Sequence, residues 1–149
     1  MGQISGSPEL LRRMRLQEGG LIEVFLFPSL YEDWLAVFDV LIESDYLVTL
    51  KRRGIVVAPS ISREMFTDGE AIDFLLEVVV GRQLWTSHLY SASLVDFQGD
   101  PREVTLSSDI DDLVGFMQVV ADAVCRPVKL VSETLNYEDA VAWITINPT

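Results

Sequence analysis

The sequence predicts an α+β fold: a two-layer α/β sandwich in which a mixed, mostly antiparallel sheet carries two or three helices on one face. Three observations support this prediction. Residues 107–126 have the periodicity of an amphipathic helix, with clear start and stop signals. Short runs rich in β-branched and aromatic residues flank this segment and a second helical segment at 29–44. The order strand, capped helix, strand therefore occurs twice, in 21–50 and in 103–131.

We interpret the repeated order as two βαβ units arranged as in a ferredoxin-like sandwich. The repeat lies in the order of elements, because the two halves share little sequence identity. If both helices follow parallel strands of one sheet, right-handed crossovers place them on the same face. The N-termini of both helices are then expected at the same end of the sheet.

The chain of 149 residues is long enough for one domain with a substantial core. We expect residues 21–149 to form a single α+β domain and residues 1–20 to form a flexible N-terminus with a short helix. That helix is predicted to begin at Ser7, because a hydroxyl followed by Pro8 and Glu9 is typical of a helix start.

The first strand and the first long helix follow from local signals. Residues 21–27 are apolar, aromatic and β-branched, which predicts a largely buried strand that ends before Pro28. Ser29 and Glu32 match a capping box. The apolar residues after them recur at helical spacing and predict a helix over 29–44.

Four more strands are predicted at 46–50, 55–58, 128–131 and 140–146. The first two form a hairpin, because the polar turn between them contains Gly54, which adopts a positive φ without strain.

The middle of the chain gives conflicting signals. Thr67 and Glu70 match a capping box, and the spacing of the apolar residues predicts a helix over 68–80. Three consecutive valines at the end of that segment favour a strand instead, so both remain open. Residues 84–97 are predicted to form one long strand with alternating faces, and residues 103–106 a short strand.

The helix at 107–126 is the best-specified element of the sequence. Its apolar residues recur at i, i+3, i+4 and i+7. Asp109, Asp111 and Asp112 place negative charge near the positive end of the helix dipole, and Arg126 lies at the negative end.

The chain is strongly acidic. It has 23 Asp and Glu against 11 Lys and Arg, which gives a formal net charge of −12. This charge repels phosphate backbones and anionic membranes and attracts basic proteins, so we expect neither nucleic acid nor a membrane as a partner. The charge alone is equally consistent with a role in solubility. The hydrophobic content of 49% leaves open a homodimer, since one core cannot be assumed to bury it all.

We expect a soluble, cytoplasmic protein. No segment reaches the run of about 20 apolar residues that a membrane-spanning helix needs, and the N-terminus lacks the apolar core of a signal peptide. The only cysteine, Cys125, excludes an internal disulfide, as is usual in a reducing compartment.

The sequence indicates no catalytic residue, metal site or cofactor. His88 is the only histidine and has no carboxylate near it in the sequence to orient it. Cys125 falls at the C-terminal end of a helix, where the dipole disfavours a thiolate, and we expect it in the core. Motifs for nucleotides, zinc and α/β-hydrolase chemistry are missing from the sequence. An enzyme is therefore the less favoured interpretation.

We hypothesise an acidic protein-binding module, of the immunity or inhibitor type, that neutralises a basic protein. Its expected binding residues are the acids of the two helix starts and a neighbouring aromatic: Tyr31, Glu32, Asp33, Asp109, Asp111 and Asp112. Helix capping explains the same carboxylates without a partner. The alternative is a small-molecule-binding domain or modest enzyme that uses one strand face, with Thr86, His88 and Tyr90.

Overall fold

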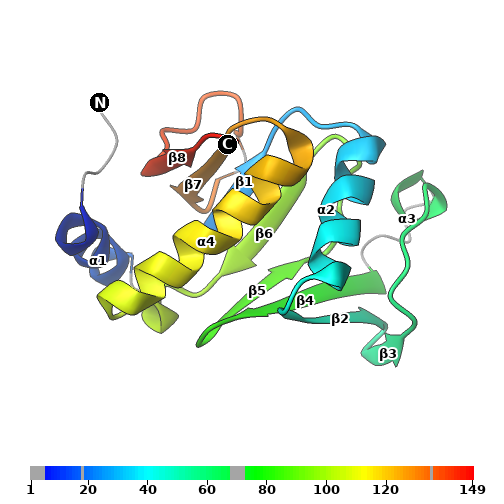
Figure 1. Ribbon diagram of the computed structural model, residues 1–149, viewed down its shortest axis with the longest axis horizontal. Coiled ribbons are helices and arrows are strands. Elements are labelled where there is room, and N and C mark those ends of the chain that lie inside the picture. Colours follow the sequence, from blue (N-terminus) through cyan, green and yellow to red (C-terminus); the bar gives the residue numbers. More distant parts are fainter. Residues whose placement is uncertain (1–5, 18, 68–72, 135) are drawn as a thin grey trace.

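The computed structural model describes residues 6–17, 19–67, 73–134 and 136–149. These residues form an antiparallel sheet of eight strands in the order β3-β2-β4-β5-β6-β1-β7-β8. The strands are β1 (Ile22–Leu26), β2 (Leu47–Arg52), β3 (Ile55–Val57), β4 (Phe74–Val80), β5 (Gln83–Ser87), β6 (Val95–Gly99), β7 (Val128–Ser132) and β8 (Ile144–Ile146). The helices are α1 (Ser7–Leu16), α2 (Tyr31–Glu43), α3 (Glu64–Thr67) and α4 (Ser107–Val124), with a 3₁₀ turn η2 (Pro101–Glu103). The α+β prediction is confirmed (Figure 1).

Helices α2 and α4 cover the same face of the sheet (Figure 1). The ring of Phe97 on β6 contacts both, with Trp34 of α2 at 5.7 Å and Phe116 of α4 at 5.2 Å between ring centroids. Trp34 and Trp85 are buried in this main core. Each buries its ring and satisfies its indole N–H: Trp34 donates to the Leu94 carbonyl and Trp85 to the Gln83 side chain.

The two long helices run in opposite directions, so the expectation that both begin at one end of the sheet is wrong. Arg126, just after α4, pairs with Asp33 in the first turn of α2. Tyr46, just after α2, packs against Phe116 of α4. The cause is that α2 follows β1 and α4 follows β6, and these strands are antiparallel neighbours.

The ferredoxin-like arrangement is not confirmed. Because every neighbouring pair is antiparallel, β1 and β2 point in the same direction, as do β6 and β7, so a helix does connect strands of equal direction twice. The pairing of β1 with β6 joins both units into one continuous sheet, and β4 and β5 lie between β2 and β6.

Residues 74–80 form strand β4 and not a helix, and residues 68–72 lie outside the described residues. The burial of β4 alternates with a period of two. It pairs with β2 on one side and with β5 on the other, and these long-range hydrogen bonds decide the competition that the local sequence left open.

The predicted strand at 84–97 is two strands. β5 ends at Ser87, and Leu89 adopts a positive φ of 55° in the loop that leads to β6. The expected strand at 103–106 is replaced by the turn η2 and an extended connection, because Pro101 and Asp100 start a 3₁₀ turn there. The strand expected at 140–146 is shorter and spans only β8.

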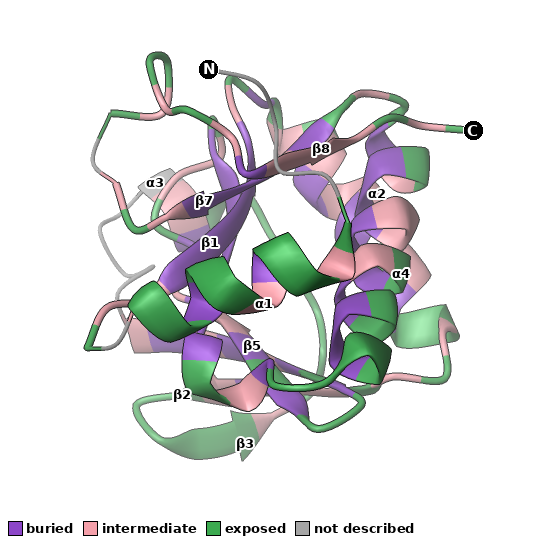
Figure 2. Cartoon of the chain, turned by 90° about the vertical axis from the view of Figure 1, so that its left-hand side faces the viewer, coloured by how far each residue is buried: buried purple, intermediate pink, exposed green. Residues whose placement is uncertain are grey.

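The hairpin of β2 and β3 is confirmed. Arg53 and Gly54 both have positive φ values, 51° and 81°, which is the conformation of a two-residue type I′ turn. Strand β3 is largely exposed and forms one edge of the sheet, as Figure 2 shows in green.

Candidate partner-binding site

The acids at the start of α2 are bound by arginines. The Asp33 carboxylate accepts the Leu30 N–H at 2.8 Å and pairs with Arg126. The Glu32 carboxylate accepts a hydrogen bond from Arg63 at 2.7 Å. The backbone N–H of Glu32 lowers the pKa of this carboxyl most, and the hydrogen bond from Arg63 lowers it further. The structure thus places these carboxylates in neutralised pairs.

Tyr31 lies against the same arginine. The Arg63 guanidinium stands 4.5 Å from the centroid of the Tyr31 ring, and the Tyr31 hydroxyl donates to the Ile61 carbonyl at 3.4 Å. The predicted aromatic anchor therefore packs against the loop before α3.

Asp109 is buried at the start of α4, with 1% of its surface exposed. Its carboxylate accepts the N–H groups of Thr105 and Leu106 at 3.0 and 2.9 Å, and Arg82 donates to it at 2.6 Å. Arg82 holds the pKa of Asp109 far below its usual range. Asp109 anchors the helix start, and its side chain is not on the surface.

Asp111 and Asp112 are exposed but point to different neighbours. Asp111 lines a groove between α4, α1 and β8. The Asp112 carboxylate lies against Gly81 in the turn between β4 and β5, only 2.3 Å from where a Cβ of that residue would stand. The charge of Asp112 also raises the pKa of Tyr46, after the larger effect of burial. The six predicted residues therefore form no single surface.

Two further acids lie at and just after the end of α2. Glu43 and Asp45 are exposed there, next to Tyr46, which lies beside α4. The sequence contains a signal for this acidic end, because α2 has no basic residue in its last turn to balance Glu43.

An exposed apolar row crosses three strands on the face of the sheet away from α2 and α4. Leu47 pairs with Val79, and Val79 pairs with Leu84, so their side chains share one face. Their exposed fractions are 67%, 36% and 38%. We refer to these three residues as the apolar row.

Carboxylates border the apolar row. Asp45 lies two residues before Leu47, and Asp112 contacts the turn between Val79 and Leu84. The Glu103 carboxylate accepts the Leu84 N–H at 3.0 Å. The apolar row together with Asp45, Glu103 and Asp112 is named here the candidate surface.

The alternative ligand residues are partly brought together. The rings of His88 and Tyr90 stack with centroids 5.3 Å apart. Tyr90 lines a cavity of about 640 Å³, and Thr86 lines one of about 270 Å³. Gln98 lines both cavities and pairs with Thr86 across the strands.

Two buried carboxylates, one of which lines the larger cavity, were missed by sequence reasoning. Glu23 lines it and accepts from the Tyr137 hydroxyl at 2.8 Å, while burial raises the pKa of Glu23. Asp96 is 2% exposed, and burial, with the charge of Glu23, raises the pKa of Asp96 to about 7. Among the described residues, Asp96 Oδ1 has no hydrogen-bond partner. Both acids stand inside apolar runs that read as strand core.

Cys125 is exposed and not in the core, because it ends α4 in the left-handed conformation at a φ of 55°. In the part of the chain that the structure describes, no group of three or more His, Cys, Asp or Glu stands close enough to hold a metal ion. Across those same residues, no helix is long and apolar enough to cross a membrane.

Comparisons with protein-family models, with curated proteins and with solved structures found no match for this chain. The candidate surface therefore rests on its own geometry.

Proposed function

We propose that this protein is a cytoplasmic module that binds a basic protein through the candidate surface and neutralises it, in the manner of an immunity or inhibitor protein. The observation that carries the proposal is the exposed apolar row with its border of carboxylates. Exposed apolar side chains aligned across three strands are costly in water, and they are typical of a surface that another protein covers.

The charges indicate which kind of partner fits. A net charge of −12 attracts a basic protein over long distances and raises its rate of association. Asp45, Glu103 and Asp112 then place negative charge at the rim, where lysines and arginines of the partner remain partly hydrated. The apolar row supplies the contact area at the centre.

The experiment is affinity capture from the source cell with the full-length protein and two arginine variants. Leu47→Arg places a charge in the apolar row. Leu16→Arg is the matched control, because Leu16 on α1 is equally exposed, at 68% against 67%. We expect a basic protein that binds the wild type and Leu16→Arg, and whose affinity for Leu47→Arg is at least 10-fold weaker.

The purified protein and its captured partner are then used to test the role of charge in binding. We expect the association rate to fall as salt is added and the dissociation rate to change little. Capture of an acidic partner, or equal affinity for the two arginine variants, would contradict the proposal.

A second candidate function is a small-molecule site for a cationic ligand, favoured by the cavity that Glu23, Tyr90 and Tyr137 line. Carboxylates and aromatic rings together suit an amine or guanidinium group. An NMR experiment that adds spermidine to the protein and follows the ring signals of His88 tests this second candidate. We expect the His88 signals to shift if this site binds the amine, and unmoved signals argue against it.

A further inference from the structure

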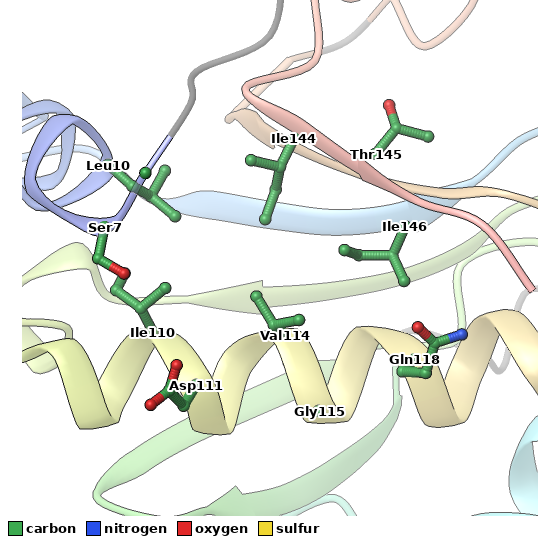
Figure 3. A pocket seen from close by; sticks show the side chains of 11 residues that line it. Ser7, Leu10, Ile110, Asp111, Val114, Gly115, Gln118, Ile144, Thr145 and Ile146 are labelled. Atoms are coloured by element: carbon green, nitrogen blue, oxygen red, sulfur yellow. The ribbon is translucent and has the colours of Figure 1, made fainter.

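A groove separate from the candidate surface lies between α1, α4 and β8. Its volume is about 600 Å³. Figure 3 shows Leu10 of α1, Ile110 and Val114 of α4, and Ile144 and Ile146 of β8 converging on it. These side chains make the lining largely apolar. Asp111 and Gln118 place polar groups along the helix wall.

The helix wall of this groove contains a glycine that packing does not require. Gly115 lies in the interior of α4, and a Cβ at this position would meet nothing within 4 Å. Glycine weakens a helix interior, and no close contact or positive φ explains it here. The effect of the missing side chain is to leave the helix backbone open to another chain.

In the part of the chain that the structure describes, the opposite wall is a strand edge without a further partner strand. Within the described sheet, β8 is the last strand and pairs with β7 alone. Ile144 and Ile146 point toward α4, whereas Thr145 points away (Figure 3). A strand added to this edge would send every second side chain into the groove, as in β-strand addition.

From this arrangement we propose that the groove binds an extended segment of a basic protein, which pairs with the β8 edge. Apolar side chains at alternate positions fill the space beside Gly115, and a lysine or arginine at the end of the segment reaches Asp111. Charge selects the occupant, because a second copy of this chain would bring another −12. The basic character of the partner rests on the proposed function, but the surface and the mode of contact are different.

The probe is a synthetic heptapeptide of sequence lysine, threonine, valine, threonine, valine, threonine, lysine, in which both lysines and both valines share one face of the strand. It is titrated into the ¹⁵N-labelled full-length protein and followed by amide chemical shifts. We expect shifts at Ile144–Ile146 and around Gly115. A peptide with glutamates in place of both lysines should bind at least 10-fold more weakly, and one with serines in place of the valines should not bind.

Variants separate the groove from general charge effects. Gly115→Leu fills the groove and should weaken binding at least 10-fold, whereas Asp39→Leu adds the same side chain at an exposed position of α2 and should not. Asp111→Asn should weaken binding about 3-fold, and Asp39→Asn, which removes the same charge elsewhere, should leave it unchanged. The amide spectrum of each variant confirms that it is folded.

Three results would overturn the groove proposal. The first is shifts confined to the apolar row, and the second is equal affinity for Gly115→Leu and the wild type. The third is a sedimentation mass of the protein alone that changes with Gly115→Leu, because the occupant would then be a second copy. Leu47→Arg should leave the peptide titration unchanged, so this proposal and the proposed function fail independently.

Discussion

Two glycines near α4 differ in what a side chain would meet. Gly115 has open space around its missing Cβ, and Gly81 has a φ of 58° and the Asp112 carboxylate against it. We expect Gly115→Ala to raise the free energy of unfolding by about 1 kcal/mol, the difference in helix propensity. Gly81→Ala should lower it by about 1 kcal/mol or more, because the left-handed conformation strains an alanine. Urea unfolding measures both, and the same sign for both would contradict these environments.

Asp96 makes the stability of the protein depend on pH. Burial raises the pKa of Asp96 from 3.8 to about 7, so the native state holds its proton more tightly than the unfolded chain does. The stabilisation is complete below the unfolded pKa of 3.8 and is lost as the pH rises through about 7. We expect Asp96→Asn to be more stable than the wild type at pH 8 by roughly 2–4 kcal/mol.

The control for Asp96→Asn is the same comparison with the wild type at low pH. At pH 4 the native state carries a neutral side chain at this position in both proteins, and Asp96 of the unfolded chain is only partly ionised, so their unfolding free energies should differ by less than about 1 kcal/mol. Denaturant titrations at the two pH values test this. A difference that is independent of pH would show that the carboxylate is not titrating.

At the scale of elements, α2 and α4 start in the same way. In each helix an aspartate, Asp33 or Asp109, accepts the N–H of the preceding leucine and pairs with an arginine from another part of the chain. The leucines, Leu30 and Leu106, are exposed. At the start of α2, Asp33 supplies the capping that was expected from Ser29, and both aspartates also connect their helix to the rest of the fold.

We expect Asp109→Asn to lower the free energy of unfolding by about 1–3 kcal/mol, because it leaves Arg82 and two backbone donors with a neutral, partly mismatched acceptor. Asp111→Asn is the matched control in the same helix turn. Its side chain is exposed, and its effect should stay within about 0.5 kcal/mol. Equal effects of the two substitutions in chemical unfolding would contradict the buried role of Asp109.

At the scale of the whole molecule, the apolar row and the net charge act in opposite directions. The row favours self-association through the open face of the sheet, and −12 on each copy opposes it. We expect a monomer at low salt and a growing dimer fraction at 1 M salt, where the Debye length is about 3 Å. Light scattering over a dilution series measures this, with Leu47→Arg expected to remain monomeric. A dimer at low salt would show that the charge does not control assembly.

The sequence by itself determined the elements whose signals are local. The apolar periodicity predicted α2 and α4, although α2 begins at Tyr31 with Leu30 and not Ser29 at its N-cap, and Gly54 predicted the β2–β3 hairpin. These signals depend on residues within a few positions of one another. The acidic character and the α+β class followed from composition and element order in the same way.

Only the tertiary structure determined the direction of each strand and helix and the burial of each side chain. Strand β4 is a strand because β2 and β5 pair with it, and Asp109 is buried because Arg82, 27 residues away, reaches it. The acids at the starts of α2 and α4 lie apart because β1 and β6 are antiparallel, and nothing in the local sequence specifies that pairing. Burial, pairing and strand direction arise from contacts between distant parts of the chain, and a one-dimensional pattern does not contain them.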